Sequence, residues 1–363
     1  MNSHDRVAAL LRREIPDQMG LFEHFWPETL SEEYWVRQGY PKGEKPEHFF
    51  DYDIAMCGGW FNTEPFLKKH EEIIEETDEW KVVKDGRGAS LKYWKKKSGT
   101  PEHVAFEVTT PEKWKSYKEA LLADNPDRIT REHMTDTRKN LEAERARGKF
   151  VVYSNLFIFE LMRATLGDQT FLPALLEEPD WIRDFCQTYL DFYRKHYEIV
   201  FREAGRPDGM FIYEDFGFKK SLFCSPQTMA ELVMPYEKEL VGYFHDHGLP
   251  VILHSCGDIT KAVPLIIAAG FDCLQPMEAK AGVNLIELAK TFGDKIAYMG
   301  NINVMALATN DPQKVQAEIL PKLAAMKQMR IPYFFHSDHS IPPNIDFKTY
   351  QYALELFRNK GRY

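Results

Sequence analysis

The segment Val251-Ile-Leu-His-Ser-Cys-Gly257 decides how the rest of the chain is interpreted. Three apolar residues lead into His254, and Cys256 follows two positions later. Side chains at positions i and i+2 of a strand leave on the same side, so an imidazole nitrogen and a thiolate sulfur can converge on one cation. Zn2+ is the first candidate for this pair of ligands. The alternative is that both residues belong to an ordinary core.

Strand signals alternate with helix signals along most of the chain. The predicted strands are Met19–Trp26, Asp53–Gly58, Lys149–Asn155, Gly209–Asp215, Val251–His254, Phe271–Pro276, Ile296–Gly300 and Tyr333–His336. Helices are predicted between them, one of them opened by Ser225-Pro226 and restarted by Pro235. This rhythm indicates parallel βαβ units, and eight strands close a (β/α)8 TIM barrel. We therefore predict an α/β barrel, with an open sheet as the alternative.

Residues 60–148 interrupt this rhythm. Asp85-Gly-Arg-Gly88 lies between two strand-like runs, which predicts a β-hairpin, and residues 103–108 predict a third strand. We expect an antiparallel and helical insertion after the first strands, lying over one end of the barrel. Because no linker-like stretch is present, residues 1–363 are expected to form a single barrel domain.

Composition excludes several classes of partner. The net charge is −9, and no basic face is clustered, which argues against nucleic acid. Five scattered cysteines are typical of a reducing compartment. The first residues lack the features of a secretory signal, and no segment is long enough to span a bilayer. We expect a cytoplasmic protein that binds neither nucleic acid nor a membrane.

Polar side chains gather where the predicted strands end, which is the rim that carries the active site of a barrel enzyme. Acid/base roles are predicted for Glu23, His24, Glu214 and Asp215, and cofactor contacts for Asn155, Asn301 and Asn303. Glu214 and Asp215 are adjacent, so one should enter the pore while the other braces a helix N-terminus or a loop. A purely structural network is an equal alternative for this pair.

Two further metal ligands are predicted from later strand ends. His339 lies in the loop past the last strand, where Asp338 is available to orient a ring, whereas His336 is expected to be a core histidine. Glu278 is the fourth candidate, because one displaceable carboxylate leaves the open position that catalytic zinc needs. Glu278 could equally pair with Lys280.

A series of motifs makes residues 150–360 resemble the uroporphyrinogen decarboxylase superfamily. The motifs are Tyr213-Glu-Asp-Phe-Gly217, His247-Gly-Leu-Pro-Val-Ile-Leu-His-Ser-Cys-Gly-Asp258, Lys280-Ala-Gly-Val-Asn284 and Gly300-Asn-Ile-Asn303. The resemblance implies a distorted (β/α)8 barrel. One branch decarboxylates uroporphyrinogen, but its arginine-rich first-strand motif is absent here. The other branch contains cobalamin-dependent methyltransferases, which hold zinc with a His-x-Cys pair, a later cysteine and, in some, a glutamate.

The second branch is the better match. His254 and Cys256 match the pair, Glu278 lies about where the glutamate falls, and His339 stands in the stretch that would hold the later cysteine. The resemblance implies a zinc-dependent methyltransferase that moves a methyl group between a methylcorrinoid, carried by a partner protein, and a thiol or related acceptor. The alternatives are a decarboxylase of a porphyrinogen or smaller carboxylic acid, and a non-catalytic metal- or corrinoid-binding barrel. A homodimer is a further expectation.

Overall fold

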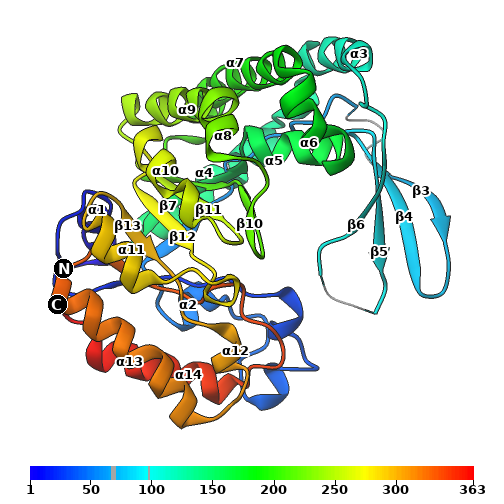
Figure 1. Cartoon of the computed structure of the whole chain (residues 1–363). Coiled ribbons are helices and arrows are strands. Elements are labelled where there is room, and N and C mark those ends of the chain that lie inside the picture. Colours follow the sequence, from blue (N-terminus) through cyan, green and yellow to red (C-terminus); the bar gives the residue numbers. More distant parts are fainter. Residues whose placement is uncertain (67–70, 97–98) are drawn as a thin grey trace.

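The computed structural model describes residues 1–66, 71–96 and 99–363, and its centre is an eight-stranded parallel barrel (Figure 1). The strand order is β1-β14-β13-β12-β11-β8-β7-β2, and every ladder between neighbours is parallel. The strands are β1 (Gly20–Leu21), β2 (Ile54–Met56), β7 (Phe150–Leu156), β8 (Gly209–Tyr213), β11 (Val251–Ser255), β12 (Cys273–Pro276), β13 (Ala297–Met299) and β14 (Tyr333–Phe335). The Asp53 N–H donates to the Leu21 carbonyl over 2.9 Å, so the barrel is nearly closed. The α/β barrel prediction is confirmed.

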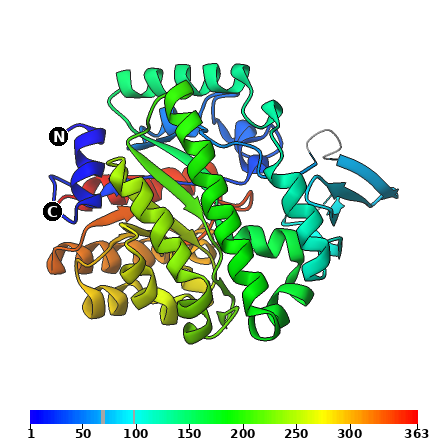
Figure 2. The same cartoon turned by 90° about the horizontal axis from the view of Figure 1, so that it is seen from above.

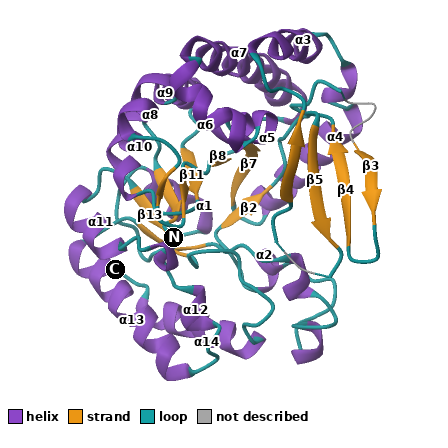
Figure 3. Ribbon diagram, turned by 45° about the vertical axis from the view of Figure 1, so that its right-hand side comes forward, coloured by secondary structure: helices purple, strands orange, loops and turns teal. Residues whose placement is uncertain are grey.

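Helices surround the barrel and cover its apolar strands (Figures 2 and 3). They are α1 (Ser3–Leu11), α2 (Pro46–Phe49), α3 (Pro111–Leu122), α4 (Arg131–Ala146), α5 (Ile158–Leu166), α6 (Asp168–Glu177), α7 (Pro179–Ala204), α8 (Pro226–Leu232), α9 (Met234–Asp246), α10 (Val263–Ala269), α11 (Leu285–Phe292), α12 (Val304–Leu307), α13 (Pro312–Met329) and α14 (Phe347–Lys360). Short 3-10 turns cover 27–30, 36–38, 126–128, 260–262 and 279–281. As predicted, Ser225 caps α8, since its Oγ accepts the Thr228 N–H. Among the described residues, no helix combines the length and the apolar character that crossing a membrane requires.

The first strand is shorter than the sequence indicates. Met19–Trp26 was expected, but only Gly20 and Leu21 join the ladder with β14. Beyond them the backbone bonds to the loop after β14 instead: the Trp26 N–H donates to the Ile341 carbonyl, and the Ile341 N–H donates to the His24 carbonyl. This pairing holds the segment that carries Glu23 and His24 against the loop that carries His339.

The interruption between β2 and β7 contains an antiparallel sheet of four strands, in the order β3-β4-β5-β6. These are β3 (Glu71–Glu76), β4 (Trp80–Asp85), β5 (Ala89–Trp94) and β6 (Glu102–Phe106), of which β3 was not predicted. The sheet projects beside the barrel (Figures 1 and 3). Its β4–β5 turn brings Arg87 to a cavity that Asn155, at the end of β7, also lines. A small hairpin, β9 (Gly217–Phe218) and β10 (Ser221–Leu222), follows β8.

The two chain ends lie side by side (Figures 1 and 2), joined by a bridge between Gln18 and Arg362. At this end of the barrel, α1 packs against β1, β2 and β7. The chemistry-bearing side chains lie at the opposite end.

Candidate metal centre

His254 points into the barrel at the carboxyl end of β11. In the parallel register it lies beside Tyr213 of β8 and Gln275 of β12. The Tyr213 ring centroid is 5.0 Å from that of His254, and the Gln275 Oε1 is 2.5 Å from the His254 Nδ1. Neighbouring strands therefore fix the ring on both sides and leave Nε2 facing the rim.

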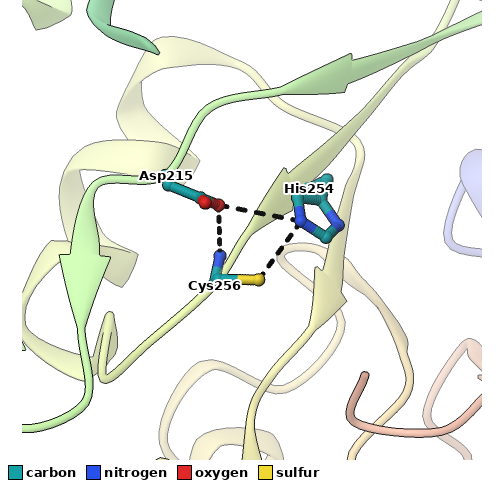
Figure 4. Close-up of side chains that lie close together, drawn as sticks. All are labelled: Asp215, His254 and Cys256. Atoms are coloured by element: carbon teal, nitrogen blue, oxygen red, sulfur yellow. Dashed lines mark hydrogen bonds and ion pairs between the residues drawn. The ribbon is translucent and has the colours of Figure 1, made fainter. Parts of the chain in front are cut away.

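Cys256 lies just beyond β11 and turns its sulfur to the same side (Figure 4). Its Sγ is 3.3 Å from the His254 Nε2, and the Asp215 Oδ1 is 3.7 Å from that nitrogen. The Asp215 Oδ1 also accepts the backbone N–H of Cys256 over 2.8 Å. Ser255, between the two, points the other way and accepts the Phe216 N–H, as strand alternation requires.

Gly257 fixes the path of the chain after Cys256. Its φ is +81°, and a Cβ there would lie 2.5 Å from the backbone carbon of Gly217. Only glycine combines this conformation with so close an approach to β9.

A second group of potential ligands shares the same sulfur. The ligand atoms of Cys256, Glu278 and His339 all lie within 4.8 Å of one another, as do those of Asp215, His254 and Cys256. We call these five residues the ligand cluster. His339 stacks against Trp26, with ring centroids 5.8 Å apart. The four predicted metal ligands are thus brought together around Cys256, and Asp215 joins them.

The cluster is electrostatically suited to a cation. Burial, with the Asp215 and Glu278 carboxylates beside it, raises the pKa of the Cys256 thiol well above its usual range. Burial, together with Lys280, lowers the pKa of His339. A divalent cation would offset the two carboxylates and reverse the preference of the thiol for its proton. Zinc–sulfur bonds of about 2.3 Å and zinc–nitrogen bonds of about 2.0 Å put tetrahedral ligand atoms roughly 3–4 Å apart. Each group of three offers an imidazole nitrogen, a cysteine sulfur and a carboxylate oxygen, which are the donor types of zinc sites.

The adjacent pair of carboxylates divides as the sequence indicated. Asp215 enters the rim, whereas the Glu214 carboxylate accepts the backbone N–H groups of Phe159 and Glu160 at the N-terminus of α5. Glu214 is fully buried beside Glu237, and burial raises the pKa of both carboxyls. Glu214 braces a helix, and a catalytic role for it stays a prediction.

Glu23 and His24 belong to a network inside the barrel. Glu23 accepts the N–H and Oγ–H of Ser337, and burial raises its pKa to about 8. The His24 Nδ1 lies 3.0 Å from the His336 Nε2, and its Nε2 lies 3.2 Å from the Tyr213 hydroxyl. His336 is fully buried, as expected of a core histidine. The network lies beneath the ligand cluster and touches it through Tyr213.

The side chains of the three predicted asparagines form hydrogen bonds with backbone groups. The Asn301 Nδ2 donates to the Met277 and Val283 carbonyls, and the Asn303 Oδ1 caps α12. The Asn155 Oδ1 accepts the Leu156 N–H, although its side chain also lines the cavity described below. Contacts of these asparagines with a cofactor stay a prediction.

Two neighbouring charged groups have other partners than the sequence offered. The Asp338 carboxylate, which was available to orient a ring, accepts the backbone N–H groups of Lys280 and Val304 and so ties two rim loops together. No ion pair joins Glu278 to Lys280 in the part of the chain that the structure describes. Instead, the Glu278 carboxylate faces the Cys256 thiol, with which it shares a hydrogen bond.

Sequence reasoning missed Gln275 and Tyr213. Gln275 is a polar residue within the apolar strand Cys273–Pro276, and it is 1% exposed. This placement signals an inward-facing amide, but its partner depends on the strand register.

Tyr213, which packs against His254, also lines a cavity of about 370 Å3 together with Asn155 and Arg87. Arg87 is paired with Glu64 over 3.2 Å. A larger cavity of about 830 Å3 lies at the other end of the barrel, beside α1, away from this chemistry.

Known proteins support this description of the fold. The chain matches a methyltransferase structure from Methanosarcina mazei with a TM-score of 0.68 at 13% identity, covering 99% of both chains. Weaker matches are an AP endonuclease of family 2 from Brucella melitensis (TM-score 0.37, 11% identity, 62% and 83% coverage) and a 3-keto-D-glucoside 4-epimerase from E. coli (0.38, 11%, 71% and 97%). No curated protein matches. Residues 158–359, which are more than half of the chain and include all five members of the ligand cluster, match the family model of uroporphyrinogen decarboxylase (URO-D), and the chain belongs to that family.

Proposed function

We propose that this protein is a zinc-dependent methyltransferase that moves a methyl group from a methylcorrinoid, carried by a partner protein, to a thiol or related acceptor. The observation that carries the proposal is the position of the Cys256 Sγ, which belongs to both groups of ligand atoms at the carboxyl end of the barrel. The similarity in fold to a methyltransferase across nearly the whole chain supports it.

Four residues would hold the metal: His254, Cys256, His339 and Glu278. Zinc bound there would lower the pKa of an acceptor thiol and present its thiolate at the barrel mouth. Glu278 is the ligand to be displaced, because a carboxylate binds zinc less strongly than a thiolate or an imidazole in this set.

The surrounding residues orient the proposed ligands and take up the proton of the Cys256 thiol. The Glu278 carboxylate faces Cys256 and is placed to take the proton from Sγ. Asp215 anchors the Cys256 backbone, and Trp26 limits the rotation of His339 by stacking on it. Tyr213 packs against His254 and lines the adjoining cavity, where an acceptor would lie.

A decarboxylase is the runner-up. A porphyrinogen with many carboxylates requires several arginines at the mouth. Among the described residues that line the cavity next to Tyr213, one is an arginine, Arg87, and it is already paired with Glu64. This observation favours methyl transfer.

Elemental analysis and a methyl-transfer assay test the proposal together. The purified protein should contain about one zinc and should demethylate free methylcobalamin in the presence of a simple alkyl thiol. Cys256→Ser and His339→Ala should lose both properties. Cys224→Ser, which alters a partly exposed thiol outside the cluster, should keep both. Zinc retained in Cys256→Ser would overturn the ligand assignment, and absence of methyl transfer by the zinc-loaded protein would overturn the reaction.

A further inference from the structure

A continuous line of hydrogen bonds crosses the barrel beneath the ligand cluster and ends on His254. It begins at the backbone carbonyl of Ser337, passes through His336 and Gln275, and reaches the Nδ1 of His254. Gln275 and His336 are both buried, so water does not compete for these bonds.

The first bond fixes the proton of His336. Its Nδ1 lies 2.5 Å from the Ser337 carbonyl oxygen, which can only accept, so this nitrogen carries a hydrogen. Burial lowers the pKa of His336 to about 3, so the ring is neutral and its Nε2 offers a lone pair. Glu23, 3.3 Å from that nitrogen, does not force a proton onto it, because burial keeps the Glu23 carboxyl neutral up to about pH 8.

The second bond fixes the orientation of the Gln275 amide. Its Nε2 lies 3.2 Å from the lone pair of His336, so the NH2 group faces His336 and donates. The oxygen must then face His254, where Oε1 lies 2.5 Å from Nδ1. On the other side of the His336 ring, the His24 Nδ1 lies 3.0 Å from the same Nε2, and the His24 Nε2 lies 3.2 Å from the Tyr213 hydroxyl.

From this line we infer that Gln275 is a positioning residue, which holds His254 as the tautomer protonated at Nδ1 and so presents the lone pair of Nε2 to the metal. The inference deepens the proposed function and rests on it. A neutral histidine in water favours the proton on Nε2, which would block the nitrogen that faces Cys256. A hydrogen bond to the far nitrogen of a metal-bound histidine both selects the tautomer and raises basicity.

The test is the tautomer of His254 in the metal-free, full-length protein, read from long-range 1H–15N correlations with histidine labelled. The wild type should show Nδ1–H at pH 7. Gln275→Leu should shift His254 toward Nε2–H and weaken zinc binding about 10- to 100-fold. Gln275→Glu keeps an acceptor oxygen and should keep the Nδ1–H tautomer, with zinc affinity within about threefold. Gln313→Leu, on an exposed helix position, is the matched control.

Each outcome decides between the two proposals. Nε2–H in the wild type overturns the role of Gln275, even if Gln275→Leu does not fold. If His254 is the Nδ1–H tautomer both in the wild type and in Gln275→Leu, the role of Gln275 is also overturned. Nδ1–H in a wild type that binds no zinc supports the orientation of His254 while the proposed function fails. Zinc binding that survives Gln275→Leu unchanged overturns the role of Gln275 and leaves the function standing.

Discussion

The Nε2 of His254 lies 3.3 Å from the Sγ of Cys256, on the inner side of one strand end. The strand supplies this spacing, because side chains two positions apart leave on the same face. Asp215 on one side, and Glu278 with His339 on the other, reach the Cys256 sulfur from other parts of the chain.

Zinc affinity should rise with pH. The two carboxylates and burial raise the pKa of Cys256, so the metal-free thiol keeps its proton through neutral pH. His339 is already neutral there, since its pKa is lowered. Binding should release about one proton, and the affinity should rise about tenfold per pH unit. Competition with a zinc-binding dye between pH 6 and 8 measures this slope, and a flat profile would contradict it.

Glu237→Gln should remove part of the pH dependence of stability. Burial raises the pKa of Glu237 to about 8 from 4.5, so the folded state binds the proton more tightly than the unfolded one. Such a group contributes its full stabilisation of the folded protein at a pH below its pKa in the unfolded state. This contribution is lost as the pH rises through its pKa in the folded state. The wild type should lose stability between about pH 4.5 and 8, by at most about 1.4 kcal/mol per pH unit for this group.

Urea unfolding at pH 5 and pH 8 measures this effect. The variant should match the wild type at pH 5 and exceed it at pH 8. Glu23 has the same sign of shift and remains in both proteins, so the difference between the two curves reports Glu237 together with its effect on the pKa of Glu214. If the stability of the two proteins changed equally between pH 5 and pH 8, the prediction would be wrong.

Gly257→Ala should displace Cys256. The left-handed backbone alone costs roughly 1–2 kcal/mol for a residue with a Cβ. The clash with Gly217 at 2.5 Å must also be relieved by moving the loop. We expect lower thermal stability together with weaker zinc binding. Gly242→Ala, where a Cβ meets nothing within 4 Å, is the control. Unchanged zinc binding in Gly257→Ala would show that the loop tolerates the shift.

Asn301→Ala should lower the free energy of unfolding. It removes the donors to the Met277 and Val283 carbonyls, and each buried unsatisfied group costs about 1–3 kcal/mol. Chemical denaturation should show a loss of about 2–4 kcal/mol. Asn303→Ala, which loses a helix cap, should lose about 1 kcal/mol. If Asn301→Ala keeps its stability but loses corrinoid-dependent activity, the predicted cofactor role is favoured over the structural one.

The sequence by itself determined the barrel and the inner strand of the site. The sequence predicts apolar strands such as Val251–Ser255 and capped helices such as α8 from a few neighbouring residues. This is possible because propensity and capping act over a few residues. The His254–Cys256 pair follows from the same local rule of strand alternation. The strand β3 was missed because the run Glu71–Glu76 is mostly charged, and its pairing with the neighbouring β4 makes it a strand. The first strand was predicted too long because its pairing with the distant β14 ends at Leu21.

Only the tertiary structure decided which distant side chains meet. Strand alternation already separated Glu214 from Asp215, but only the tertiary structure decided that Asp215 enters the rim while Glu214 braces α5. It also turned Asp338 to the backbone of two loops and placed Gln275 between two histidines. The physical reason is strand register and loop packing: they fix contacts between residues far apart in the chain, and no local pattern contains that information.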